Sequence, residues 1–203
     1  MVFQKRRPTV DLERRIESLQ VEALQCMIPG EAATPLNQAG DLLMRSGDPA
    51  GALELYGQAV DSLVEADRFE AAIGLCNKII RTVPNVVRAR CTLAWLAIGA
   101  GFTGELSNRV GDYVSAAEAC GRETIAQRHV RQMADVVEIH DVRIMLGEYL
   151  IHLGDDCAAN DLFGQIYSER NTGTQRSIGQ DERWRGVRQA ALMNLRTGAA
   201  MVA

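Results

Sequence analysis

The sequence predicts an all-α fold, and three observations lead to this prediction. Alanine and leucine dominate the apolar residues while aromatic residues make up only 5% of the chain, a composition that favours helices over sheets. Apolar residues recur every three or four positions, which places them on one face of a helix. The sequence lacks alternating apolar and polar runs bounded by turn pairs, the usual pattern of β-hairpins.

Five helices are predicted in the N-terminal half. The first covers residues 9–27, with Thr9 as a candidate cap, and its apolar stripe consists of Leu12, Ile16, Leu19, Ala23 and Met27. Pro29 and Gly30 end this helix, and residues 31–35 are predicted to form a loop. The next four helices are predicted at residues 36–46, 50–65, 68–83 and 86–100. Because the breaks between them are so short, neighbouring helices are expected to be antiparallel.

The C-terminal half is predicted to continue in the same way. One helix covers residues 103–120, and residues 122–153 contain no glycine or proline before Gly147. A break is predicted near His140, because Asp141 can cap a new helix. The remaining elements are a helix at residues 157–169, a polar connector at 171–179, and a helix at 181–196 whose apolar side carries Trp184, Val187, Ala191, Leu192 and Leu195.

A pattern of small and large residues occurs twice, 107 positions apart. Its first copy is Ala39-Gly40, Leu43, Gly47-Asp48, Ala52, Tyr56 and Ala59, and its second is Leu146-Gly147, Leu150, Gly154-Asp155, Ala159, Phe163 and Ile166. Small residues allow two helix axes to approach closely, and the aromatic ring fills the space beside them. A short helix pair cannot bury its whole apolar face, so several pairs are expected to stack.

This pattern resembles the tetratricopeptide repeat, and the resemblance covers residues 33–170. The family's tryptophan is missing, since Leu36 and Arg143 stand at its position, and the family's proline is matched only at Pro84. The resemblance implies a right-handed α-solenoid of antiparallel helix pairs with flanking helices at both ends. The implied domains are a basic N-terminal segment with a flanking helix at residues 1–35, a repeat domain at 36–170, and a linker with a capping helix at 171–203.

Partners of such repeat proteins lie on the concave surface formed by the first helix of each pair. By this register the candidate partner-binding residues are Asn37, Asp41, Arg45, Arg88, Trp95, Glu148 and His152. Trp95 is either a binding anchor or a core residue. Asn37 and Asp41 lie near positions where some family members clamp a carboxylate with lysine and asparagine, but the lysines are absent, so this specificity is not inferred.

The predicted function is therefore that of a non-enzymatic adaptor or scaffold for a peptide, helix or small protein. Two alternatives stay open: a secretion chaperone for an aggregation-prone client, and a regulatory module of a signalling or transcription system. The net charge of −4 argues against a nucleic-acid partner, and no stretch approaches the ~20 apolar residues that insert into a membrane. The terminal helices offer stripes through which a homodimer could form.

Catalytic and cofactor sites are not expected. The sequence lacks a Gly-x-Ser-x-Gly motif, and no cysteine stands beside an evident histidine base. The three histidines, His129, His140 and His152, lack the spacing of a metal site, and His129 and His140 are expected to be partly buried. Five widely spaced cysteines in apolar contexts predict buried, reduced thiols and a cytoplasmic location.

Overall fold

The computed structural model describes residues 10–100 and 103–173, and every regular element in these ranges is an α-helix. The predicted all-α class is confirmed for this part of the chain. Thr9 and the helix predicted at residues 181–196 lie outside the described residues. The described residues form two compact units, the first ending at Pro84 and the second beginning at Asn85. The domain boundaries predicted at residues 35 and 170 stay predictions.

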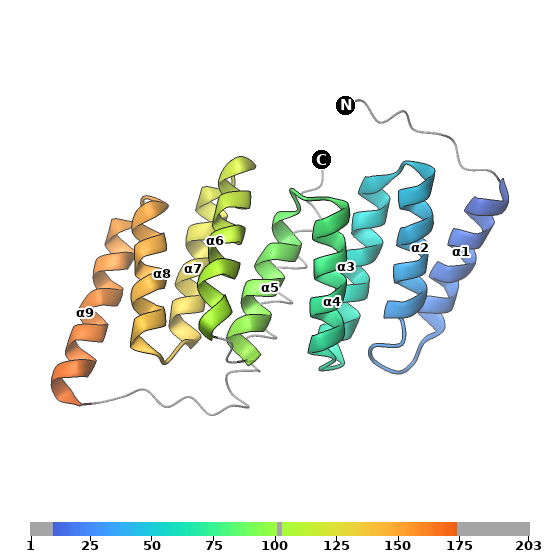
Figure 1. The fold of residues 1–203 in the computed structure, drawn as a ribbon. Coiled ribbons are helices and arrows are strands. Elements are labelled where there is room, and N and C mark those ends of the chain that lie inside the picture. Colours follow the sequence, from blue (N-terminus) through green and yellow to red (C-terminus); the bar gives the residue numbers. More distant parts are fainter. Residues whose placement is uncertain (1–9, 101–102, 174–203) are drawn as a thin grey trace. The chain divides into compact units, whose positions relative to one another are not determined.

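The first unit contains four helices that alternate in direction (Figure 1), namely α1 (Val10–Gln25), α2 (Ala33–Ser46), α3 (Pro49–Glu65) and α4 (Phe69–Thr82). Helix α2 packs against α1 and α3, and α3 also packs against α4. Leucine, isoleucine and alanine side chains fill the contacts between these helices, with Tyr56 as the largest fully buried side chain of the unit.

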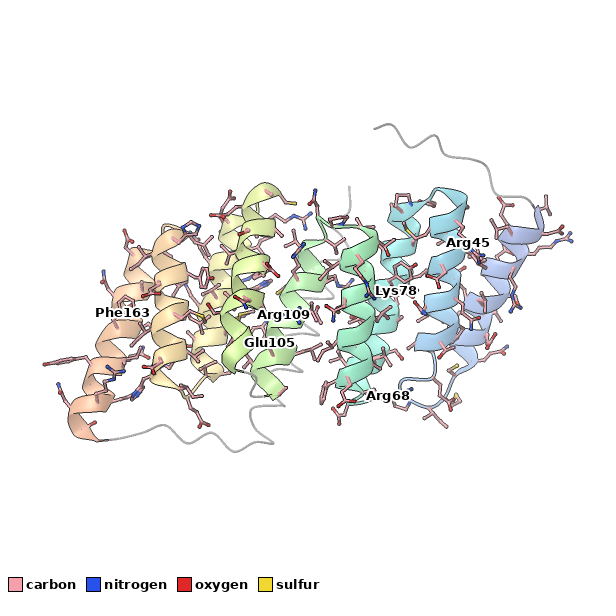
Figure 2. All side chains as sticks on the ribbon, in the orientation of Figure 1. Arg45, Arg68, Lys78, Glu105, Arg109 and Phe163 are labelled. Atoms are coloured by element: carbon pink, nitrogen blue, oxygen red, sulfur yellow. The ribbon has the colours of Figure 1, made fainter. Side chains whose placement is uncertain are left out.

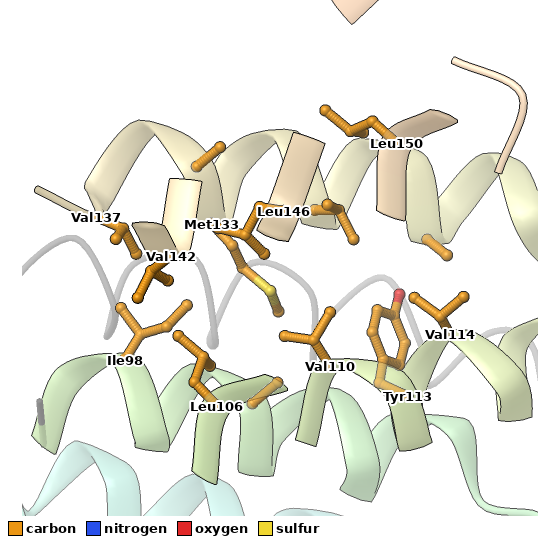
Figure 3. Packing of buried hydrophobic residues seen from close by; sticks show 14 of the residues in the cluster. Ile98, Leu106, Val110, Tyr113, Val114, Met133, Val137, Val142, Leu146 and Leu150 are labelled. Carbon is orange, nitrogen blue, oxygen red and sulfur yellow. The ribbon is translucent and has the colours of Figure 1, made fainter. Parts of the chain in front are cut away.

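The second unit contains α5 (Val87–Ala100), α6 (Thr103–Ala119), α7 (Glu123–Val136), α8 (His140–His152) and α9 (Asp156–Thr172). Helix α6 contacts α5, α7 and α8, while α8 also contacts α7 and α9. In the core of this unit, Met133 of α7 lies opposite Leu106 and Val110 of α6, and Leu146 of α8 completes the layer (Figure 3). None of the described helices is long and apolar enough to cross a membrane.

Most predicted helix boundaries agree with the structure to within a few residues, and the exceptions have local causes. The break near His140 is confirmed, because residues 137–139 separate α7 from α8. Its predicted cap is wrong: Ile139 occupies the capping position, and Asp141 lies in the first helical turn, where a carboxylate still interacts favourably with the helix dipole. The loop predicted at residues 31–35 is shorter than expected and ends at residue 32. Helix α2 begins at Ala33 and accommodates Pro35 because a first-turn N–H has no intrahelical partner.

The repeated Gly-Asp pair forms the same turn in both units. Gly47 and Gly154 adopt left-handed backbone angles, with φ of 83° and 80°, which glycine reaches without steric cost. Asp48 then caps α3 by accepting a hydrogen bond from the backbone N–H of Gly51 at 3.2 Å. Asp155 caps α9 in the same way, through the N–H of Ala158 at 3.3 Å. The 107-residue sequence repeat therefore corresponds to a repeated local structure.

The second shared feature is a glycine that faces an aromatic ring on the next helix. A Cβ atom at Gly40 would lie 2.6 Å from Cε1 of Tyr56, and one at Gly147 would overlap the ring of Phe163 in the same manner. Ala52 and Ala159, one turn before these rings, are fully buried. In both units, therefore, the aromatic ring of one helix packs against a glycine of the preceding helix, as the sequence pattern predicts.

Candidate protein-interaction surface

A polar cluster joins α2 and α4 across the surface of the first unit. Asn37 and Asp41 lie one turn apart on α2, and the Nζ of Lys78 on α4 donates to both side chains, at 2.7 Å from Oδ1 of Asn37 and 2.5 Å from Oδ1 of Asp41. The same ammonium group lies 4.9 Å from the ring centroid of Tyr56, a distance at which a cation and an aromatic face attract each other. We refer to Asn37, Asp41, Tyr56 and Lys78 as the Lys78 cluster.

Tyr56 connects this cluster to the core. Its side chain is only 1% exposed, its ring packs against Gly40, and its hydroxyl donates to Oδ1 of Asp41 at 2.5 Å. The side chains of Lys78 and Asp41, in contrast, are 31% and 42% exposed. The cluster therefore rests on a buried ring while its charged groups stay partly exposed to solvent.

The electrostatics of the cluster follow from this partial burial. Burial alone would raise the pKa of Asp41, but the hydrogen bonds from Lys78 and Tyr56 and the nearby positive charges of Lys78 and Arg45 together lower the pKa below its ordinary value. The pKa of Tyr56 is raised, first by burial and then by its hydrogen bond to the Asp41 carboxylate. Asp41 is thus an anion, and Tyr56 a neutral donor, throughout the neutral pH range.

The lowered pKa of Asp41 predicts a pH-dependent contribution to stability. Because the folded-state pKa lies below the unfolded value of about 3.9, the contribution is complete above that value and is lost as pH falls through the folded-state pKa. We expect Asp41→Asn to be less stable than the native chain at pH 7, by about 1 kcal/mol or less for so exposed a group. This difference in stability should shrink steadily as the pH is lowered from about 5 into the acid range below the unfolded-state pKa. Urea unfolding at steps across this pH range measures the difference. A difference that stays constant with pH would contradict the assigned role of the carboxylate.

The structure places the other predicted binding residues in different surroundings. Arg45 is exposed on α2, one turn after Asp41, whereas Arg88 is half-buried on α5. Glu148 and His152 are exposed on α8, and Nε2 of His152 lies 2.9 Å from Oε1 of Glu118 on α6. Two of these contacts involve a neighbouring helix: Lys78 of α4 bridges Asn37 and Asp41, and Glu118 of α6 contacts His152.

Trp95 occupies the core of the second unit. Its side chain is 1% exposed and belongs to the same apolar cluster as Leu106, Val110 and Met133. A side chain this deeply buried reaches a partner only after its unit rearranges. Of the two roles that the sequence leaves open for Trp95, the structure favours the core role.

A cysteine lies beside a histidine in the folded chain, although the two residues are 38 positions apart in the sequence. Sγ of Cys91 lies 3.3 Å from Nδ1 of His129, and the hydroxyl of Tyr113 lies 2.7 Å from the same nitrogen. All three side chains are buried, and burial raises the pKa of the Cys91 thiol to about 12. Because a cysteine nucleophile requires a lowered pKa and access to substrate, this trio has the properties of a polar contact inside a core rather than those of a catalytic pair.

The remaining cysteines and histidines differ in part from expectation. His129 is buried and His140 half-buried, as predicted. All five cysteines are free, but only Cys76 and Cys91 are buried, whereas Cys120 and Cys157 are exposed and Cys26 is half-buried. The apolar residues beside each cysteine in the sequence do not show whether that cysteine lies on the buried or on the exposed face of its helix. Among the described residues, no group of three or more histidine, cysteine or acidic side chains is arranged to hold a metal ion.

Sequence reasoning missed Lys78 and the polar role of Tyr56. Lys78 lies 37 positions from Asp41, and local periodicity carries no information about contacts at that separation. One signal was present, because Lys5 and Lys78 are the only lysines in a chain whose other basic residues are arginines. No protein-family model, curated protein or solved structure matches this chain.

Proposed function

We propose that this chain is a non-enzymatic adaptor of the tetratricopeptide-repeat type, which binds a peptide, a helix or a small protein. In this proposal the helix pairs stack as a right-handed solenoid, and the first helices of successive pairs provide the binding surface. The Gly-Asp turn and the glycine–aromatic contact, each present in both units, support the assignment. The net charge of −4 favours a protein over a nucleic acid as the partner.

The observation that carries the proposal is the Lys78 cluster. A donor, an acceptor and two opposite charges from two helices, α2 and α4, are held in one place above the buried ring of Tyr56. Binding orders flexible surface side chains at a cost of about 0.5–1.5 kcal/mol each, so side chains that are already ordered bind with a smaller entropic loss. A partner that contacts α2 and α4 would meet such a surface.

The test is a matched pair of charge reversals on the first unit. Arg45 lies next to the cluster, while Arg68 precedes α4, ten residues from Lys78 and therefore about 15 Å away along the helix axis; Figure 2 shows the two arginines at opposite ends of the unit. We expect Arg45→Glu to weaken partner binding by about tenfold or more and Arg68→Glu to leave it unchanged. Both residues are exposed, so neither change should affect folding.

The tagged full chain is first used as bait to isolate binding proteins from an extract of its host. Each purified partner is then titrated against the native chain, Arg45→Glu and Arg68→Glu. Lys78→Gln should weaken the same partners as Arg45→Glu, because it removes the charge that holds Asn37 and Asp41 together. Partners that bind all versions equally would place the binding surface elsewhere, and a chain that retains no specific protein would overturn the proposal.

A further inference from the structure

Helix α1 has two apolar faces, of which only one is covered. Ile16, Leu19 and Ala23 are buried where α1 packs on α2. Val10, Val21 and Leu24 lie on the opposite side and are 63%, 52% and 85% exposed. Met27 and Ile28, which follow the helix, are also exposed. Exposed large apolar side chains concentrate in this one segment of the described chain, and such concentrations mark interaction surfaces.

The exposed face of α1 has the spacing of a coiled-coil seam. Val10, Arg14, Glu17, Val21 and Leu24 are separated by alternating steps of four and three residues, which keeps them in one line along a helix. Arg14 and Glu17, like the apolar residues, are exposed. The stripe therefore combines apolar positions at both ends with one positive and one negative charge between them. We call these five residues the α1 stripe.

The order of charges in the stripe suits a second copy of itself. In an antiparallel pair whose two-fold axis passes between residues 15 and 16, Arg14 faces Glu17 of the second copy and Val10 faces its Val21. Each contact occurs twice, as a self-complementary interface requires. A parallel pair would instead place Arg14 opposite Arg14 and Glu17 opposite Glu17, and like charges at such positions repel.

We infer that the α1 stripe is a self-association surface, through which two copies of this chain pair with their α1 helices antiparallel. The contact buries Val10 and Val21 against each other and forms two ion pairs between Arg14 and Glu17. With so few apolar contacts the pair is concentration-dependent rather than permanent. The surface is separate from the Lys78 cluster, so dimerisation would double the number of partner-binding surfaces and strengthen binding to a partner with repeated sites.

A charge-swap experiment tests this pairing directly. Arg14→Glu places glutamate opposite glutamate in a homodimer, and Glu17→Arg places arginine opposite arginine. We expect each variant alone to associate at least about tenfold more weakly than the native chain, a change of about 1.4 kcal/mol. An equimolar mixture of the two variants restores both ion pairs and should recover native association, as should the double variant. Sedimentation velocity from about 1 μM to about 1 mM chain measures all of these.

Matched controls come from the same helix. Arg15→Glu and Glu22→Arg make the same charge changes at exposed positions that the 3.6-residue turn directs away from the stripe, and both should associate like the native chain. Helix content by circular dichroism establishes that every variant stays folded. A native chain that is monomeric up to about 1 mM, or a mixture that does not recover association, overturns the inference. Val21→Asp serves as a second probe: loss of a different host protein without any change in oligomeric state would assign the stripe to that protein instead.

Discussion

Replacing Glu169 by alanine is expected to lower the free energy of unfolding by about 3–5 kcal/mol. The guanidinium group of Arg143 on α8 is 0% exposed and donates from Nη1 to Oε2 of Glu169 on α9 at 2.5 Å. Nη2 of Arg143 donates to Gln165 at 3.2 Å, and Nε2 of His140 lies 3.1 Å from the same Glu169 oxygen. Removing the carboxylate therefore leaves a fully buried positive charge without its anion.

The Arg143–Glu169 ion pair need not stabilise the fold, even though removing one partner destabilises it. A variant in which both partners are replaced measures this difference. Arg143→Met in the Glu169→Ala background replaces the stranded charge with an apolar side chain of similar length, so we expect the double variant to regain most of the lost stability. Asp141→Ala is the matched control, because its 3.4 Å contact with Arg170 joins the same two helices at exposed positions and should cost less than about 1 kcal/mol. Urea unfolding followed by circular dichroism compares the four chains. A loss below about 1 kcal/mol for Glu169→Ala would show that the charge escapes to solvent.

The second large effect is expected at Gly40. Gly40→Ala should destabilise the chain by about 1–3 kcal/mol, although alanine is a better helix former than glycine by about 1 kcal/mol. The reason is that the new Cβ would lie 2.6 Å from the Tyr56 ring, and this ring is buried and tied through its hydroxyl to Asp41. The ring cannot move aside without breaking the Lys78 cluster.

The same substitution at Gly74, in the same unit, is expected to have the opposite effect on stability. Gly74 lies within α4, and a Cβ atom at this position would meet nothing within 4 Å. Gly74→Ala should therefore stabilise the chain by about 0.5–1 kcal/mol through helix propensity alone. Thermal unfolding of both variants gives the sign of each effect. Two substitutions of the same sign would mean that the Gly40–Tyr56 contact does not control the packing of α2 on α3.

Local features of this fold follow from the sequence more directly than contacts between residues far apart in the chain. The sequence predicts the helices, the two Gly-Asp turns and the packing of Tyr56 against Gly40. Each of these features depends on residues close together in the chain or on a repeated spacing. The anion that pairs with Arg143 could not be predicted from the sequence, because Glu169 lies 26 positions away on another helix. The sequence pattern therefore leaves a buried arginine at position 143 unexplained, and the structure explains it through Glu169.

The candidate site was predictable only in part, for the same reason. The register on α2 identified Asn37 and Asp41, but their shared contact, Lys78, comes from α4. Trp95 illustrates the opposite problem: the repeat register assigns it to the open face, whereas its side chain is buried. Helical periodicity gives the direction of a residue on its own helix, and burial depends in addition on what the neighbouring helices cover.

The position of Tyr56 means that the interior of the first unit and its polar surface are not independent. One edge of this ring rests on Gly40, and the hydroxyl at its tip orients Asp41, which belongs to the same helix as that glycine. Under the proposed function, substitutions beneath the surface are therefore expected to alter which partner is recognised while every exposed residue stays the same. Searches for variants with new specificity should accordingly include buried residues such as Gly40 and Tyr56 as well as the exposed residues of the proposed binding surface.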